Sequence, residues 1–222
     1  MLDDIEIGYE KKKPNHSYGI TGYYMMYKNQ LVLTGKINDV GAYTRTNIKS
    51  SYRAGIELNG RSRINSYVNI YANLAFSTNK LKNYSDYVDD YDNGGQQIFT
   101  YRRKDISYSP AIIGSADLNI IPVKKVEIDL LSKYVSRQYL DNTSNGKRSL
   151  DPFFVEDMKA SYSIAKVFKE TKIVFQVNNI FGVRYEPNGY TYSYYYSGKL
   201  NTFNYYFPMA GRNFMVAVNV KI

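Results

Sequence analysis

A strict alternation of apolar and polar side chains runs through most of the chain and is clearest between Tyr67 and Thr78. One side of this segment is apolar and is formed by Val68, Ile70, Ala72, Leu74 and Phe76. A β-strand has a side-chain period of two, so the segment has one apolar and one polar surface. A tilted strand needs about 9–11 residues to cross a bilayer, and this segment is long enough. The alternation therefore predicts a membrane-spanning strand.

The same alternation recurs along the chain, whereas helical periodicity is nearly absent. It predicts an all-β, antiparallel transmembrane β-barrel segment of about nine strands. We expect these strands at roughly residues 3–12, 17–33, 43–59, 65–82, 104–121, 125–140, 153–165, 171–186 and 205–222.

The connections between the predicted strands alternate in length. The short ones are Lys13-Pro14-Asn15, Gly60-Arg61-Ser62-Arg63, Pro122-Val123-Lys124 and Val167-Phe168-Lys169-Glu170. The long, polar ones are centred near residues 34–42, 83–103, 141–152 and 187–204. Short periplasmic turns at one end and long extracellular loops at the other are typical of an outer-membrane barrel.

The formal charge of +9 first suggests a nucleic acid or an anionic lipid as partner. No segment resembles a basic helix, an RNA-binding strand motif or a zinc module, so nucleic acid is not expected. The basic residues instead collect at the predicted short-turn end, as Lys11, Lys12, Lys13, Arg61, Arg63, Lys124, Lys125, Lys166, Lys169 and Lys172.

Aromatic residues are abundant, with 25 Tyr and 10 Phe but no Trp, and Cys is absent. The tyrosines gather near predicted strand ends, as Tyr84, Tyr87, Tyr91, Tyr190, Tyr192, Tyr194, Tyr195 and Tyr196. Rings at the headgroup level would form the aromatic girdles of a membrane barrel. Tyrosines at loop tips suit a ligand-binding role equally well.

Several simpler classes are excluded by what the sequence lacks. No apolar run reaches about 18 residues, so no transmembrane helix is expected. The first residues, Met1 to Ile5, do not resemble a signal peptide. The only histidine, His16, follows Lys13-Pro14-Asn15 in a predicted turn, where we expect a solvated side chain.

Two segments near the end of the chain resemble the barrel of TonB-dependent outer-membrane receptors. Val177-Asn178-Asn179-Ile180-Phe181-Gly182-Val183-Arg184-Tyr185 resembles the penultimate strand of that family. Pro208-Met209-Ala210-Gly211-Arg212-Asn213-Phe214, with the alternating valines after it, resembles the final strand. Two upstream stretches, Tyr23–Leu31 and Arg53–Leu58, are similar to further barrel strands, so the resemblance spans the whole chain.

The resemblance implies a barrel of about 22 strands filled by an N-terminal plug domain. We therefore expect residues 1–222 to be the C-terminal portion of such a barrel, with the plug domain and signal peptide absent. The sequence departs from the family in two ways. It ends on Ile222 rather than an aromatic residue, and it has no counterpart of the plug or the energy-coupling segment.

The function that the resemblance implies is a receptor and transporter of the cell outer membrane. It would take up a scarce solute, such as an iron chelate, cobalamin, a glycan or a peptide. Its partners would be outer-membrane lipid, the solute, and a TonB-type energy-coupling complex reached through the missing plug of the parent protein.

Polar residues on the predicted inner face would line the lumen: Arg53, Glu57, Asn69, Asn73, Asp117, Lys133, Arg137, Gln176 and Asn178. We favour hydration and inter-strand hydrogen bonding over ligand contact for each. The acidic stretch with Asp86, Asp89, Asp90, Tyr91 and Asp92 suits a cation, a sugar or simple solvation, without the spacing of a calcium loop. No residue is assigned as catalytic, cofactor-binding or metal-ligating, and the ligand contacts stay unassigned.

Three alternatives remain open. The first is a complete small outer-membrane barrel acting as a porin or adhesin, since eight or ten strands can close. The second is a barrel enzyme, which one turn histidine and no cysteine make unfavourable because a nucleophile needs an activating base. The third is a soluble all-β binding domain, in which the apolar faces would pack on each other.

Overall fold

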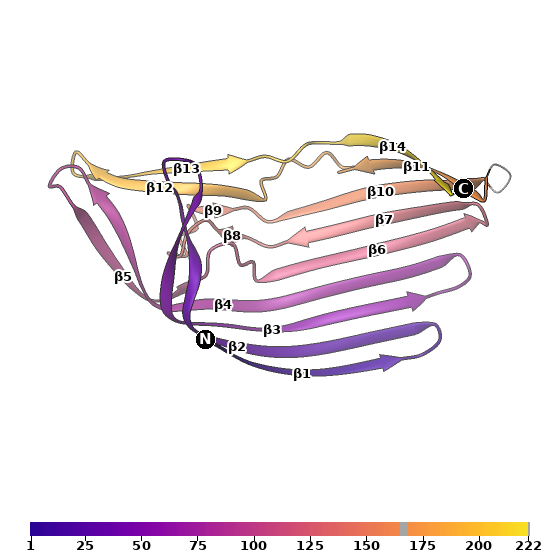
Figure 1. Ribbon diagram of the computed structural model, residues 1–222, viewed down its shortest axis with the longest axis horizontal. Coiled ribbons are helices and arrows are strands. Elements are labelled where there is room, and N and C mark those ends of the chain that lie inside the picture. The colour runs from indigo at the N-terminus through magenta and orange to yellow at the C-terminus, as the bar shows by residue number, and fades with distance from the viewer. Residues whose placement is uncertain (165–167, 222) are drawn as a thin grey trace.

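The computed structural model describes residues 1–164 and 168–221, and within them the regular structure consists of β-strands (Figure 1). The strands are β1 (Leu2–Lys12), β2 (His16–Ile37), β3 (Tyr43–Arg63), β4 (Val68–Asp90), β5 (Gln96–Asp105), β6 (Ile112–Val123), β7 (Val126–Val135), β8 (Gln138–Tyr139), β9 (Ser149–Leu150), β10 (Phe153–Ile164), β11 (Glu170–Asn178), β12 (Asn188–Tyr196), β13 (Lys199–Phe207) and β14 (Asn213–Lys221).

Nine of these strands form one continuous antiparallel wall in the order β1-β2-β3-β4-β6-β7-β10-β11-β14. Each wall strand overlaps one of the nine predicted segments, so the predicted fold class is confirmed. Short turns join the wall strands at one end, which we call the short-turn end (right in Figure 1). The opposite end, where the long connections lie, is the long-loop end.

The two faces of the wall differ as the alternation predicts. On β1, β3, β4 and β14, the apolar side chains point away from the protein, and Ile7 is 77% and Val216 is 67% exposed. The other face carries polar groups that bond to one another across strands, such as Asn73 Nδ2, which donates to Ser115 Oγ at 2.8 Å. An apolar surface of this extent is costly in water and is what a bilayer would cover.

The short turns close with local backbone hydrogen bonds. Lys13 and His16 bond in both directions, and Ile64 donates to the carbonyl of Val68 at 3.0 Å. The fourth predicted turn, Val167-Phe168-Lys169-Glu170, includes Val167, which lies outside the described residues, as do Lys166 and the predicted strand end at 165. The same holds for Ile222.

The long-loop end differs most from the prediction, because much of it is strand. The segment predicted as a loop over 83–103 contains the end of β4 and most of β5, which pair with each other. The predicted loop 187–204 contains most of the hairpin β12–β13. Four predicted wall strands are also too long. β6 begins at Ile112, β7 ends at Val135 and β11 ends at Asn178, while the predicted strand 205–222 is divided between β13 and β14.

Left-handed backbone conformations explain where the wall strands stop. One of them is Asn83 (φ 54°), where β4 turns away from the wall. The others are Tyr108 (φ 52°), which precedes β6, and Asn179 (φ 53°), which follows β11. Asn visits this conformation more readily than most residues. At each of these points the chain leaves the extended path that alternation alone would continue.

A small apolar cluster holds the long-loop end together. It consists of Val32, Ile48, Leu81, Tyr84 and Ile106, with Tyr101 packed against it. Tyr84 is 4% exposed and stacks on Tyr101 with ring centroids 6.4 Å apart. The prediction of Tyr84 as a girdle residue is therefore wrong, because its ring is in the core of the folded loops. Burial also raises the pKa of Tyr84 above its ordinary value.

Asn179 explains the Asn-rich motif after β11. Its backbone N–H donates to Asp157 Oδ1 at 2.7 Å, and its side-chain Oδ1 accepts from the N–H of Val183 at 2.9 Å. Its Nδ2 donates to the carbonyls of Val183 at 2.8 Å and Ala210 at 3.4 Å. One buried amide therefore joins the turn after β11 to the segment that leads into β14.

We expect Asn179→Ala to lower the stability of the barrel by about 1–3 kcal/mol, because it removes hydrogen bonds to the partly buried backbone of Val183 and strains a positive φ. The measurement is the temperature at which the full-length protein loses its compact, heat-modifiable migration on a gel. Asn178→Ala is the control, because among the described residues the side chain of Asn178 bonds to other side chains, those of Gln176 and Asn213, and not to backbone. Equal midpoints for the two variants would contradict the assigned role of Asn179.

Candidate functional site

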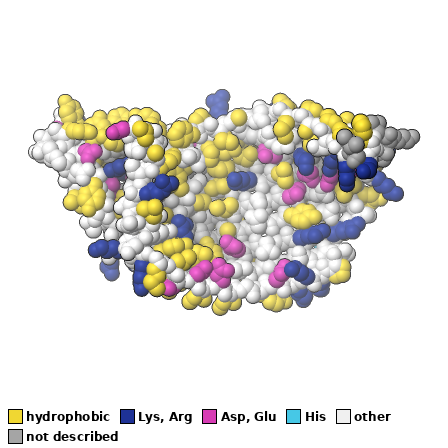
Figure 2. Space-filling model, viewed as in Figure 1, with side chains coloured by type: hydrophobic (Ala, Val, Ile, Leu, Met, Phe, Trp, Pro, Cys, Tyr) yellow, Lys and Arg dark blue, Asp and Glu magenta, His cyan; other side chains and the backbone are white. Residues whose placement is uncertain are grey.

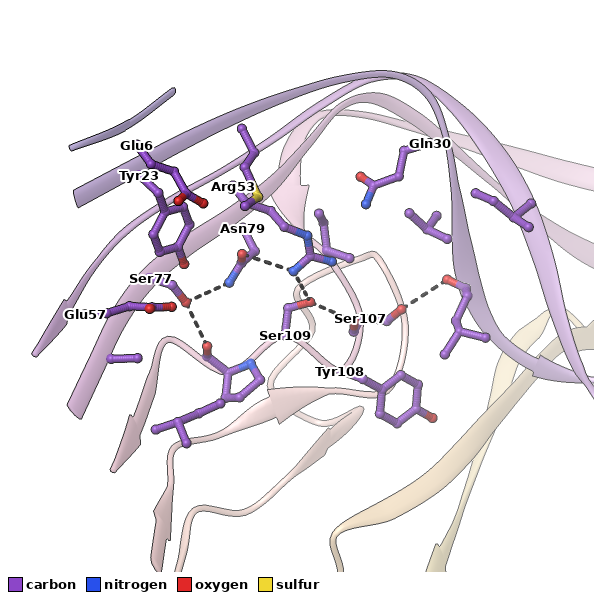
Figure 3. Close-up of a pocket in the computed structure, with 18 of the residues that line it drawn as sticks. Glu6, Tyr23, Gln30, Arg53, Glu57, Ser77, Asn79, Ser107, Tyr108 and Ser109 are labelled. Atoms are coloured by element: carbon purple, nitrogen blue, oxygen red, sulfur yellow. Dashed lines mark hydrogen bonds between the residues drawn. The ribbon is translucent and has the colours of Figure 1, made fainter. Parts of the chain in front are cut away.

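A cavity lies on the polar face of the wall where β1–β4 meet the segment 106–110 (Figure 3). We call it the luminal cavity; it has a volume of about 610 Å³. Its polar lining is Glu6, Thr21, Tyr23, Gln30, Arg53, Glu57, Ser77, Asn79, Ser107, Tyr108 and Ser109. Its volume lies within the range of about 300–1,000 Å³ typical of small-molecule sites.

Arg53 on β3 is the central donor of this cavity. Its guanidinium donates from one nitrogen to Asn79 Oδ1 at 3.1 Å and to Ser109 Oγ at 3.2 Å. Asn79 in turn donates to Ser77 Oγ at 2.9 Å, and Ser77 donates to the carbonyl of Pro110 at 3.1 Å. This chain of bonds (dashed in Figure 3) fixes the guanidinium and ties the segment 106–110 to the wall.

The lining offers a solute both charge signs and both hydrogen-bonding roles. Glu6 and Glu57 face the same cavity as Arg53, and apolar groups such as Leu31 and Ile106 complete it. A few fixed polar groups among apolar ones give a binding site orientation and specificity. The arrangement suits capture of a polar solute.

The hydroxyl of Tyr108 links the lining of the cavity to β12. It donates to the carbonyl of Gly189 at 2.5 Å, and Tyr43 donates to the same carbonyl at 2.7 Å. Burial is the largest cause that raises the pKa of Tyr108 above its ordinary value, so the phenol stays a neutral donor. The cavity is thus connected to the hairpin β12–β13.

The predicted luminal residues fall into four groups, the last of which, Asp117 and Lys133, lies in a separate polar region. Arg53 and Glu57 line the luminal cavity. A second group forms side-chain hydrogen bonds within its strand or to the next one, as expected for residues that stabilise the wall rather than contact a ligand. It consists of Asn69, Asn73, Gln176 and Asn178. Arg137 is misplaced by the prediction, because it lies exposed in the connection between β7 and β8, beyond the end of the wall strand.

Asp117 and Lys133 belong to a second polar region on β6, β7, β10 and β11. Glu127 and Asp129 accept from Asn119 at 2.9 and 2.6 Å. Lys159 pairs with Asp129 at 3.5 Å, and Lys172 with Glu127 at 2.8 Å. Figure 2 shows acidic and basic side chains gathered toward the short-turn end of these strands. These contacts pair Glu127 and Asp129 with lysines, whereas Asp117 Oδ1 is buried without a hydrogen-bond partner among the described residues. The region suits a hydrated inner surface.

The acidic stretch at the tip of β4 is used for structure. Asp90 accepts from the amides of Asp92 and Asn93 and from the side chains of Asn93 and Gln97. Asp92 accepts from the amides of Ser197 and Gly198 at 2.7 and 2.8 Å. In the described part of the chain, no group of three or more acidic, His or Cys side chains is placed to hold a metal ion.

Several residues of the luminal cavity were missed by the sequence analysis, among them Asn79, Ser107, Tyr108 and Ser109. The last three fall in a segment predicted to be strand, so no pattern marked them as a turn. The sequence Ser107-Tyr108-Ser109-Pro110 offered a hint, because Ser and Pro favour turns and the residue before Pro is restricted. His16 lies where expected, exposed at the start of β2, with Nδ1 2.8 Å from Ser62 Oγ.

Comparison with protein-family models gives a match over residues 3–180 to the family described as TonB dependent receptor-like, beta-barrel. The chain belongs to this family. Its members are transport receptors of the outer membrane rather than enzymes. A search of curated proteins finds no match.

Solved structures of three receptors share the fold. They are the ferric-catecholate import receptor Fiu from E. coli K12 (15% identity, TM-score 0.66), the ferric yersiniabactin uptake receptor FyuA from Yersinia pestis (15%, 0.65) and the siderophore receptor PiuA from Acinetobacter baumannii (18%, 0.67). The matches cover 99%, 98% and 98% of this chain but 27%, 29% and 28% of the receptors. This chain therefore spans less than a third of the length of these receptors. In the described part of the chain, no helix is long and apolar enough to cross a membrane.

The acidic stretch makes a pH-dependent prediction. Hydrogen bonds, first from Gln97 and then from Asn93, lower the pKa of Asp90 from 3.8 to about 2. The hydrogen bonds that lower this pKa stabilise the folded hairpin fully above pH 3.8, where the carboxylate is ionised in the folded and the unfolded chain. This stabilisation is lost as the pH falls through about 2 and the carboxylate takes up a proton. We expect the backbone amides of Asp92 and Asn93 to lose protection from hydrogen exchange between pH 5 and pH 2. The measured rates are first corrected for the pH dependence of the intrinsic amide exchange rate.

The measurement is hydrogen–deuterium exchange on the full-length protein, with Asp90→Asn as the comparison. The variant should already show weak protection at pH 5 and little further change. Protection that is equal at both pH values in the unsubstituted protein would contradict the assigned role of the carboxylate.

Proposed function

We propose that residues 1–222 form the C-terminal portion of the barrel of a TonB-dependent receptor in the cell outer membrane, one that takes up a scarce solute with energy supplied through TonB. The wall contributes membrane-spanning strands, and the long-loop end faces the outside of the cell. The observation that carries the proposal is the luminal cavity, a polar site on the inner face, directly beneath the folded loops.

The solute belongs to the class of iron chelates, cobalamin, glycans and peptides. The family membership and the fold shared with siderophore receptors support an energised receptor. The coupling partner is a TonB-type complex, which acts on a plug domain of the whole receptor. Outer-membrane lipid is the partner of the exposed apolar face, because an apolar surface of this extent is costly in water.

The alternative of a complete small barrel requires β1 to pair with β14. In the described part of the chain β1 pairs with β2 and β14 with β11, and no bridge joins the two outer strands. We therefore favour a wall that further strands complete.

Deletion of the gene in its own host tests the proposal. Cells are supplied with ⁵⁵Fe-siderophores, ⁵⁷Co-cobalamin, labelled oligosaccharides or labelled peptides, with and without a protonophore. We expect accumulation of one of these probes to depend on the gene and to stop when the protonophore is present. Unchanged accumulation of all probes in the deletion strain, or gene-dependent entry that ignores the protonophore, would contradict energised uptake.

Substitution of Arg53 tests the luminal cavity itself. We expect Arg53→Ala in the full-length receptor to weaken binding of the transported probe about tenfold, or about 1.4 kcal/mol, because a fixed cationic donor is lost. Arg61→Ala is the matched control: it removes the same charge from the same strand, at the short-turn end, where Arg61 lies 5.3 Å from the ring centre of Tyr71. Equal affinities for both variants would exclude Arg53 from the binding site.

A further inference from the structure

A second cavity lies outside the wall, between two hairpins of the long-loop end. One hairpin is formed by the end of β4 with β5, and the other by β12 with β13; their tips meet at the left of Figure 1. The cavity has a volume of about 350 Å³. We call it the inter-hairpin cavity. Its lining is Asp86, Val88, Phe99, Tyr101, Lys104, Thr143, Ser144, Asn145, Arg148, Tyr195 and Leu200.

The two hairpins are fixed to each other, so the cavity is preformed. Tyr91 donates its backbone N–H to the carbonyl of Tyr195 at 3.0 Å, next to a short parallel bridge between β4 and β12. Asp92 receives two amides from the turn of the other hairpin, as described above. A preformed site loses less entropy when a ligand binds.

One wall of the cavity is aromatic. The rings of Phe99 and Tyr195, from opposite hairpins, lie nearly parallel with centroids 6.3 Å apart, and Tyr101 extends this wall. Flat ring faces contact apolar surfaces well, and they carry a negative π face. The C–H face of a pyranose ring is such a surface, with weakly positive hydrogens.

The polar part of the cavity contains a buried carboxylate and a buried guanidinium. Asp86 and Arg148 are each 7% exposed. Their closest atoms are 4.0 Å apart, and the other ion pair of Asp86, with Lys36, is 3.9 Å long. Neither contact is a hydrogen bond by distance. The carboxylate of Asp86 also accepts a hydrogen bond from the backbone N–H of Tyr87. Two carboxylate oxygens offer about four acceptor sites, so Asp86 keeps capacity to accept further hydrogen bonds.

Arg148 is also not saturated by the protein. One terminal nitrogen donates to Asp141 Oδ2 at 2.9 Å and the other to Thr202 Oγ1 at 3.3 Å. Its Nε is buried without a partner among the described residues. A guanidinium has five N–H donors, so donor capacity remains at this residue.

The charges of the lining select against ionic ligands of either sign. An anion would meet the carboxylate of Asp86, with Asp141 behind it, and a cation would meet Arg148 and Lys104. A hydroxyl group satisfies both sides, because it donates to a carboxylate and accepts from a guanidinium. Thr143, Ser144 and Asn145 add neutral partners of the same kind.

We propose that the inter-hairpin cavity binds a neutral pyranose sugar residue, with one ring face against Tyr195 and Phe99 and its hydroxyls at Asp86 and Arg148. The site lies on the folded loops, separate from the luminal cavity, and does not require that the chain transports anything. The sugar has two possible sources: a soluble oligosaccharide, or the glycan of a surface glycolipid.

The experiment is saturation-transfer NMR and calorimetry with the purified full-length protein. The probes are the methyl glycosides of glucose, galactose, mannose and N-acetylglucosamine, together with maltotriose. We expect at least one of these sugars to bind. We expect Tyr195→Ala to weaken that binding at least tenfold, because the aromatic wall is lost.

The matched control is Tyr196→Ala, which removes the same side chain one residue further along β12, on the opposite face, where Tyr196 is 61% exposed. It should leave the affinity unchanged. Asp86→Asn is a second variant that keeps the shape of the site, and it should also weaken binding at least tenfold. This variant keeps the proposal testable if Tyr195→Ala fails to fold.

Competition separates the two sources of the sugar. Displacement of the bound probe by purified lipopolysaccharide indicates a surface glycan, whereas displacement by soluble oligosaccharide alone indicates a soluble one. Absence of binding by every neutral probe, equal affinities in the variants at positions 195 and 196, or stronger binding of citrate than of any sugar would overturn the proposal. None of these outcomes bears on the uptake assay with the deletion strain.

Discussion

The structure depends first on one constraint, the pairing of backbone N–H and C=O groups between neighbouring strands. Hydrocarbon offers these groups no water, so each unpaired group costs several kcal/mol. The wall meets this constraint with continuous antiparallel registers, for example between β2 and β3 from His16–Ser62 to Leu33–Arg45, with a shift only near Ile37. The same constraint means that β1 and β14 each need a further partner in a membrane.

Once the backbone is paired, the side chains are free to divide between two environments. One face of the wall exposes Ile, Val and Phe, and the other joins Asn, Ser, Asp and Lys across strands. The polar face therefore remains compatible with water or a solute. The luminal cavity follows from this division, because Arg53 lies on the polar face where the segment 106–110 folds back against the wall.

The alternation predicted the wall well, because each strand there has one apolar and one polar side. At the long-loop end both sides of a strand face water or other loops, so alternation no longer reports which partner a strand takes. β4 shows this change: it pairs with β6 up to Phe76 and with β5 from Lys80 onward. The choice of partner depends on residues distant in sequence, which no local pattern records.

The sites were less predictable than the strands for the same reason. The alternation along β3 alone predicted that Arg53 and Glu57 lie on the inner face, and both line the luminal cavity. Arg148 lies in a polar loop without any period, and its burial results from contacts with Asp141 and Thr202, the latter on β13. Tyr84 resembled a girdle residue in sequence but fills a core that only the folded loops create.

The central claim is that the wall separates lipid from an aqueous lumen, and spin labelling along β4 tests it most directly. The chain has no cysteine, so single cysteines from Ile70 to Phe76 can each carry a nitroxide in the full-length protein in a bilayer. We expect oxygen to be more accessible at Ile70, Leu74 and Phe76, and a polar nickel chelate to be more accessible at Tyr71, Asn73 and Ala75. A profile without a period of two, or one in which the nickel chelate reaches both faces equally, would contradict a membrane-spanning wall.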